Sequence, residues 1–185
     1  MDNNVSFRVH KDELADAAAW VARSLPTKST QPVLRAVVIT ADDNGLEFAG
    51  FDYEVSTRVR IGAEVNDPGR VAVAGKLLAD IVGTMPNDAI EVSTDSKVMT
   101  LKARSSRFEL PLIALDDYPQ LPHLPEVTGR ISPAALTGAV TQVASAAGRD
   151  DTLPMLTGIH VEIDGENVTL TATDRFRLAQ RHLTW

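Results

Sequence analysis

The chain has 185 residues, which is enough for one large domain, or for one domain and part of another. Its composition, 44% hydrophobic and 23% charged, is typical of a globular protein that buries a core. The sequence contains no cysteine, which excludes disulfides, thiolate catalysis and cysteine-ligated metal centres within it. A net charge of -7 argues against a uniformly basic surface, although a basic lining can coexist with an acidic exterior.

The first residues show no sign of an export signal. The opening Met1-Asp2-Asn3-Asn4-Val5 has no basic stretch followed by an apolar one. No run approaches the ~20 apolar residues of a membrane-spanning helix. We therefore expect a cytoplasmic protein without a membrane partner.

The first sixty residues predict a short strand, a helix, a proline-bearing loop and then strands. The helix is indicated by apolar residues at helical spacing: Leu14, Ala17, Ala18 and Val21. Residues 33–40 carry a β-branched strand pattern. Asp42-Asp43-Asn44-Gly45 supplies residues that tolerate positive φ, and it predicts a hairpin turn.

Residues 70–113 repeat this order of elements. A strand at 70–73 precedes a helix from Gly75 to Thr84, and strands follow at 89–94, 98–103 and 106–113. The helix is expected to turn four apolar side chains inward: Leu77, Leu78, Ile81 and Val82. The first domain is thus predicted to hold two β-α-β-β-β units.

Residues 114–128 predict an extended linker, because they combine Pro119, Pro122 and Pro125 with acidic residues. A short strand and a second copy of the helix are expected next. Ser132-Pro133 provides an N-cap and a proline at the first helical position. The helical spacing comes from Leu136, Ala139, Val140 and Val143. A strand at 155–162 and a turn at 164–167 complete the pattern.

An offset of 122 residues aligns 7–63 with 129–185 without a gap, and matching residues fall at structural positions. Leu14 matches Leu136, and Asp52 matches Asp174. The repeat predicts a complete domain over 1–127 and the first half of a second domain over 128–185, with a sheet edge left unpaired. The expected fold class is α+β, with two helices packed on antiparallel sheets in each complete domain.

No catalytic pattern is recognisable. The four histidines lie far apart without metal-ligand spacing, and the adjacent aspartates fall in expected turns or linkers. The nucleotide-binding motifs GxxxxGK(S/T) and GxGxxG do not occur in the sequence. No serine lies in the G-x-S-x-G motif of a hydrolase nucleophile. The sequence therefore predicts a binding protein with no catalytic residue, metal or cofactor. An enzyme with an unrecognised site remains the alternative.

The segment Ala172-Thr173-Asp174-Arg175-Phe176-Arg177-Leu178-Ala179 places two guanidinium groups around an aromatic ring. One interpretation is an edge strand with Phe176 inward and the arginines outward. The other is a groove for a partner, because arginine and aromatic side chains are frequent at interaction hot spots.

Taken together, these features resemble the bacterial DNA polymerase III beta sliding clamp family. The resemblance covers the whole chain and rests on the repeat and four motifs. These are Pro32-Val33-Leu34, Ser106-Arg107-Phe108-Glu109-Leu110, Asp117-Tyr118-Pro119 and the segment 172–179. It implies the DNA clamp fold, with three domains per subunit and a head-to-tail homodimer closed into a ring. The ring would encircle duplex DNA irrespective of sequence, as a non-catalytic processivity factor for the replicative polymerase. The third domain is absent from this sequence.

The resemblance also assigns residues to three sites. DNA phosphates are expected to meet Arg23, Lys28, Lys76 and Arg149. The groove for short linear motifs of the polymerase and clamp-loader subunits matches Leu156, Thr173, Arg175, Phe176, Arg177 and Leu178. The subunit interface matches Ile81, Met85, Arg107, Phe108 and Leu110. Arg175 departs from the small residue of many family members, which leaves the shape of the groove open. A protein–protein adaptor without DNA function is the alternative reading of the repeat.

Overall fold

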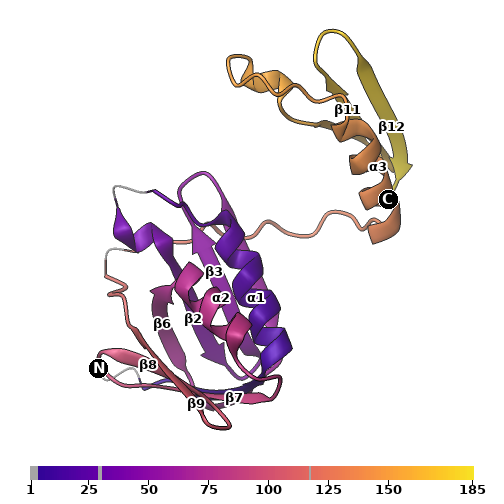
Figure 1. Ribbon diagram of the computed structural model, residues 1–185. Helices are drawn as coiled ribbons and strands as arrows, with labels where there is room; N and C mark the ends of the chain where they lie inside the picture. Colours follow the sequence, from indigo (N-terminus) through magenta and orange to yellow (C-terminus); the bar gives the residue numbers. More distant parts are fainter. Residues whose placement is uncertain (1–3, 29–30, 117) are drawn as a thin grey trace. The chain divides into compact units, whose positions relative to one another are not determined.

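The computed structural model describes residues 4–28, 31–116 and 118–185. The chain divides into two compact parts, an N-terminal region, Met1–His123, and a C-terminal region, Leu124–Trp185 (Figure 1). The division falls inside the proline-bearing segment 114–128, slightly ahead of the boundary expected after residue 127. Each region has its own sheet system and core.

The N-terminal region contains two helices and nine strands among its described residues. In chain order these are β1 Ser6–His10, α1 Lys11–Ser24, β2 Ala36–Asp42, β3 Gly45–Phe51, β4 Ser56–Ile61, β5 Glu64–Asp67, β6 Gly69–Ala74, α2 Gly75–Thr84, β7 Ala89–Thr94, β8 Val98–Ala103 and β9 Ser106–Pro111. The predicted α+β class and the doubled β-α-β-β-β order are confirmed. The short strand β5 is an addition that the sequence pattern did not indicate.

The two β-α-β-β-β units interlock by exchanging their first strands. One sheet has the order β5-β1-β7-β8-β9 and the other β4-β3-β2-β6, with antiparallel neighbours throughout. Thus β1 pairs with β7 of the second unit, and β6 pairs with β2 of the first. Neither unit can complete its sheet alone, so the duplicated halves fold as one body.

Helices α1 and α2 lie side by side over the sheets and close the core (Figure 1). The inward face of α1 is as predicted, with Leu14 and Val21 fully buried. On α2 the prediction was partly wrong, because Leu77 is 43% exposed while Leu78 and Val82 are buried. Residues four apart share a helix face, whereas Leu77 lies about 100° around the helix from Leu78.

Two predicted strands begin later than expected. Pro32–Arg35 forms a 3-10 turn before β2, and Pro154–Leu156 forms one in the equivalent place of the C-terminal region. Proline at the first position of each turn has the φ that a helical turn requires and no N–H to leave unpaired. The predicted strand at 106–113 likewise ends at Pro111, after which Leu112 bridges to Val73 of β6.

The linker motif packs back on the N-terminal region. Tyr118 is buried against Ala36, Val38 and Ala72 on the face of β2 and β6 opposite the main core. Burial raises the pKa of the Tyr118 phenol. Asp117, which shares the motif, lies outside the described residues.

The C-terminal region contains α3 Pro133–Ala144, β10 His160–Asp164, β11 Asn167–Thr173 and β12 Leu178–Thr184, with the sheet order β10-β11-β12. Ser132 caps α3 as predicted, accepting a hydrogen bond from the backbone N–H of Ala135 at 3.2 Å. The short strand predicted before α3 is absent from the described residues. In the N-terminal region β1 pairs with β5 on one side and β7 on the other. The described residues of the C-terminal region contain no counterpart of β5 or β7, so a strand before α3 would have no partner.

No helix among residues 4–28, 31–116 and 118–185 is long and apolar enough to cross a membrane. Over the same ranges, no three His, Asp or Glu side chains gather closely enough to hold a metal ion.

Candidate functional sites

A pocket of about 700 Å³ lies in the C-terminal region between the loop after α3 and the turn joining β11 to β12. Its walls combine apolar and charged side chains. The lining residues are Ala147, Gly148, Arg149, Asp150, Leu153, Leu156, Asp174, Arg175, Phe176 and Arg177. All of them belong to the C-terminal region, so this region forms the pocket by itself.

The first wall is a loop closed by a short backbone contact. The N–H of Gly148 donates to the carbonyl of Leu156 at 2.7 Å, and a Cβ at Gly148 would come within 3.2 Å of the same oxygen. The Asp150 carboxylate accepts from the hydroxyl and the backbone N–H of Thr152, at 2.6 and 3.0 Å. These bonds hold the pKa of Asp150 below its usual value. Asp150 is therefore a structural acceptor within the loop.

The second wall is a tight turn organised by Asp174. Its carboxylate accepts the backbone N–H groups of Phe176 and Arg177, at 3.1 and 3.0 Å, and pairs with the Arg177 guanidinium at 3.0 Å. Desolvation raises the pKa of Asp174, but these hydrogen bonds together outweigh it and leave the pKa below its usual value. The Thr173 hydroxyl donates to the Arg177 carbonyl at 2.7 Å. The backbone is thereby fixed while the Phe176 ring stays 90% exposed.

The N-terminal region repeats this turn with different side chains. Asp52 accepts the backbone N–H groups of Glu54 and Val55, at 3.1 and 2.7 Å. The residue after each aspartate has positive φ, 74° at Tyr53 and 78° at Arg175. Since the same backbone forms around Tyr-Glu-Val and around Arg-Phe-Arg, the side chains of 175–177 are not needed to build the turn.

Four of the six residues expected in the groove line the pocket: Leu156, Arg175, Phe176 and Arg177. Thr173 instead anchors the turn, and Leu178 lies beside it at the exposed start of β12. Phe176 does not point inward as the edge-strand interpretation required. The pocket residues that sequence reasoning did not assign to it are Ala147, Gly148, Arg149, Asp150, Leu153 and Asp174. The identity of Asp174 with Asp52 in the repeat was the one available signal.

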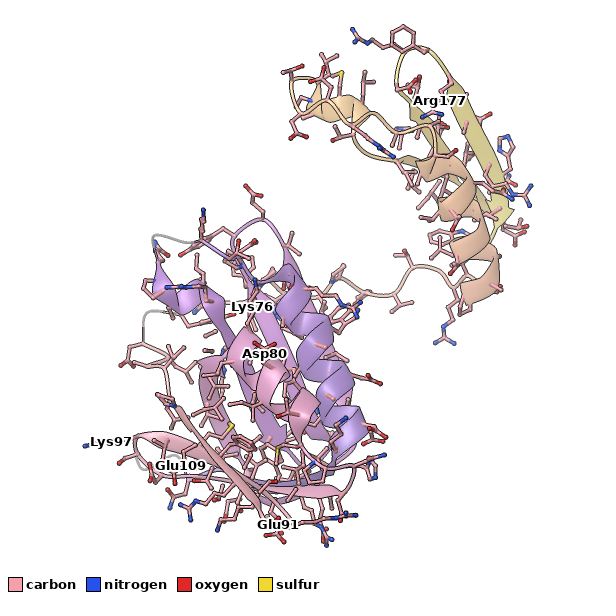
Figure 2. The ribbon with its side chains drawn as sticks, viewed as in Figure 1. Lys76, Asp80, Glu91, Lys97, Glu109 and Arg177 are labelled. Atoms are coloured by element: carbon pink, nitrogen blue, oxygen red, sulfur yellow. The ribbon has the colours of Figure 1, made fainter. Side chains whose placement is uncertain are left out.

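Three expected DNA contacts gather at one end of the helix layer. Arg23 lies in the last turn of α1, Lys28 follows that helix, and Lys76 lies in the first turn of α2, where Figure 2 labels it. The two helix ends touch, because a Cβ at Gly75 would lie 2.3 Å from a methyl group of Leu25. Arg35, which was not anticipated, lines a depression of about 380 Å³ together with Lys76. The fourth expected contact, Arg149, lies in the pocket of the C-terminal region.

The expected interface residues are buried to different degrees. Met85 and Leu110 belong to the core, Ile81 and Phe108 are half-buried against it, and Arg107 is exposed and paired with Glu109 at 2.5 Å. Strand β9, which carries the last three of the five expected residues, is the terminal strand of its sheet. Figure 2 shows Glu109 and Glu91 at this sheet, away from α2.

Comparison with known proteins decides the family. Residues 5–122 match the model of the DNA polymerase III beta subunit, N-terminal domain, and residues 130–185 match that of its central domain. The chain belongs to the DNA polymerase III beta subunit family. This order of two successive family domains is the one that the repeat indicated.

Relatives and solved structures agree with the family. The chain is 48% identical over 181 residues to the beta sliding clamp of Streptomyces coelicolor, covering 98% of this chain and 48% of the relative. It is 45% identical to that of Micrococcus luteus, covering 98% and 58%. The chain thus spans about half the length of the curated relatives it matches.

The predicted clamp fold is confirmed by solved structures. The sliding clamp from Bacillus subtilis superimposes with a TM-score of 0.85 at 25% identity, over 98% of this chain and 50% of that one. A Pseudomonas aeruginosa sliding clamp bound to griselimycin gives 0.86 at 28% identity, with the same coverage.

Proposed function

We propose that this chain forms part of a DNA sliding clamp, a non-catalytic protein that encircles duplex DNA and tethers the replicative polymerase. The observation that carries the proposal is the succession of two clamp-family domains along one chain. We further propose that residues 1–127 form a complete clamp domain, that 128–185 form the first half of the next, and that the protein acts in the cytoplasm without a cofactor.

The DNA-facing part of the proposal rests on the basic end of the helix layer. A tether that slides must contact phosphates rather than base edges, through few and exchangeable cations. Arg23, Lys28, Lys76 and Arg35 are exposed there. Lys76 lies at the N-terminus of α2, where the helix dipole disfavours a cation and favours a phosphate. An anion bound between the ammonium group and the helix end would resolve that conflict.

The tethering part rests on the pocket of the C-terminal region. Short linear motifs of the polymerase and the clamp-loader subunits would place an apolar side chain against Leu156 and Phe176. Exposed aromatic and arginine side chains on a fixed backbone are suited to this, because little ordering is required on binding. Thr173 would support the turn, and Leu178 would extend the apolar surface.

Ring closure is proposed to use β9 and the end of α2. The outer edge of β9 leaves backbone N–H and C=O groups free to pair with a strand of a second subunit, head to tail. Phe108 and Ile81 would add apolar contact at the same place, supported from the core by Met85 and Leu110, while Arg107 would provide charge.

The test uses the intact protein that carries this chain, loaded onto nicked circular DNA by a clamp loader. Gel filtration should show the protein eluting with the circle and leaving it once a restriction enzyme linearises the DNA, because a closed ring slides off free ends. Equal loss from circular and linear DNA would contradict encirclement. Peptide binding without retention on circles would favour an adaptor.

A variant pair tests the DNA-facing residues. Lys76→Gln should lower the salt dependence of DNA binding by about one phosphate contact, a slope change of roughly 0.9. Lys97→Gln removes an exposed cation from the hairpin between β7 and β8, well away from α2 in Figure 2, and should leave the slope unchanged. Equal effects of the two substitutions would argue against a specific DNA-facing end.

A further inference from the structure

In the pocket of the C-terminal region the two carboxylates have hydrogen-bond partners, whereas two of the three guanidinium groups have none among the described residues. Asp150 is occupied by Thr152, and Asp174 by the backbone of its turn and by Arg177. The side chains of Arg149 and Arg175 make no hydrogen bond or ion pair within the described ranges 4–28, 31–116 and 118–185. Both carboxylates are therefore held internally, whereas two guanidinium groups remain available to a ligand.

The two free guanidinium groups border an apolar surface. Leu153, Leu156 and Ala147 are half-buried in the pocket wall, and the exposed ring of Phe176 lies beside Arg175 in the turn. A ligand that fills this pocket meets cations and apolar side chains together. Charge complementarity then requires an anionic group next to an apolar one.

Arg175 occupies a backbone position that does not suit it. At φ 78° a side chain is strained, and glycine would adopt the same conformation freely. The equivalent Tyr53 tolerates the strain and contacts the Phe51 ring at a centroid distance of 5.5 Å, whereas the Arg175 side chain has no partner among the described residues. The Arg175 guanidinium at the rim of the pocket is therefore available to a ligand.

We propose that the pocket binds a peptide segment carrying a carboxylate beside an apolar side chain, and that Arg149 and Arg175 select the carboxylate. The inference rests on the proposed partner-binding function and deepens it by naming the chemistry of the partner. A guanidinium group can donate two parallel hydrogen bonds to one carboxylate, so that the geometry of the pair as well as its charge is recognised. It also places Arg149 among the peptide contacts rather than on the DNA.

The experiment measures fluorescence anisotropy of two labelled peptides on the 185-residue chain. The probes are Gly-Glu-Leu-Leu-Phe and Gly-Gln-Leu-Leu-Phe, which differ only in the carboxylate. We expect the acidic peptide to bind roughly fivefold tighter, the size of a favourable exposed ion pair. The preference should shrink as NaCl rises from about 50 mM to about 500 mM, because salt screens such pairs.

Substitutions distinguish selection of the carboxylate from peptide binding itself. Arg149→Gln and Arg175→Gly should each reduce the preference, measured as the ratio of the two dissociation constants, and together abolish it. Arg181→Gln removes an exposed guanidinium of the same region that does not line the pocket, and should keep the full preference. Phe176→Ala should weaken both peptides equally.

Three other outcomes would each refute a specific statement about the pocket. Equal binding of the two peptides by the unaltered chain would refute selection by Arg149 and Arg175 while leaving a peptide-binding pocket in place. A preference that survives the double substitution would refute the assignment of these two residues. Binding of neither peptide would overturn both the inference and the tethering role of the pocket.

Discussion

Leu14 and Leu136 occupy the same place in the two copies of the repeat, yet Leu14 is 1% exposed and Leu136 is 40% exposed. In the N-terminal region α1 packs against α2 as well as against the sheet. The described C-terminal region has a single α-helix, α3, and only its Ala139 and Val143 face is buried. A second helix such as α2 therefore buries the flank of the first helix that the sheet does not reach.

The strands differ in the same way. Ile39 of β2 is buried because β2 lies between β3 and β6, whereas the equivalent Val161 of β10 is 52% exposed because β10 pairs with β11 alone in the described chain. In both copies the local sequence is sufficient to form the helix and the strands. Closing the core also requires the strands exchanged between units, β1 and β6, and the second helix, α2. The pocket needs neither, since it is built entirely from the loop after α3 and the turn at 174–177.

The largest expected contrast is between two leucine truncations. Leu14→Ala should destabilise the N-terminal region by about 4 kcal/mol, because it leaves a cavity in a closed core, whereas Leu136→Ala should cost less than about 1 kcal/mol. Each region has one tryptophan, Trp20 or Trp185, so urea unfolding followed in single-tryptophan backgrounds reports them separately. Equal losses would show that the uneven burial has no energetic meaning.

Next in size is the contrast between two turn glycines. Gly45 has φ 105°, and an added Cβ would lie 2.4 Å from the Ile61 carbonyl, whereas Gly165 has φ 57° and open space around it. Gly45→Ala should therefore cost about 3 kcal/mol and Gly165→Ala about 1 kcal/mol. Thermal unfolding of the two variants measures the difference, and a larger loss at Gly165 would contradict it.

A smaller, pH-dependent effect is expected at Asp174. Its folded pKa lies below the ordinary value, so the charged form stabilises the turn above about pH 4, and that contribution disappears as the pH falls through the folded pKa. Asp174→Asn should lower the Tm of the C-terminal region at pH 7 and progressively less on acidification. Glu162→Gln, on exposed β10, is the control. A Tm deficit that stays constant down to pH 2 would rule out this linkage.

The smallest effect concerns backbone strain in the two matching turns. Arg175→Gly should stabilise the C-terminal region by about 0.5 to 1 kcal/mol, because glycine adopts positive φ without strain. Tyr53→Gly gains the same relief but loses the contact with Phe51, so its net effect should be near zero. Chemical unfolding of both variants checks the sign, and destabilisation by Arg175→Gly would mean that the guanidinium has an internal role.

Periodicity predicted the helices well because each has a continuous apolar face. The span of α2 was predicted residue for residue, and the cap at Ser132 followed from residue type alone. The late starts of β2 and β10 were missed, since a β-branched pattern does not reveal that a preceding proline starts a 3-10 turn. The exchange of β1 and β6 could not be read from the sequence, because pairing between distant strands leaves no local signal.

The pocket was only partly foreseeable. The segment 172–179 was singled out by its arginines and aromatic ring, but nothing in the sequence placed Arg149 or Leu153 beside it. Those residues reach the pocket through the loop that Gly148 and Leu156 close, a contact set by tertiary folding. The burial of Met85 and Leu110 could not be predicted either, because it depends on how the strands of the second unit pack in the core.

Amide chemical-shift mapping of the 185-residue chain with the acidic peptide would show whether one of the two matching turns is a recognition site and the other is not. We expect perturbations at 147–150, 153–156 and 174–177, and none at the equivalent turn 52–55. Perturbations of equal size at 52–55, or none at 174–177, would contradict this expectation.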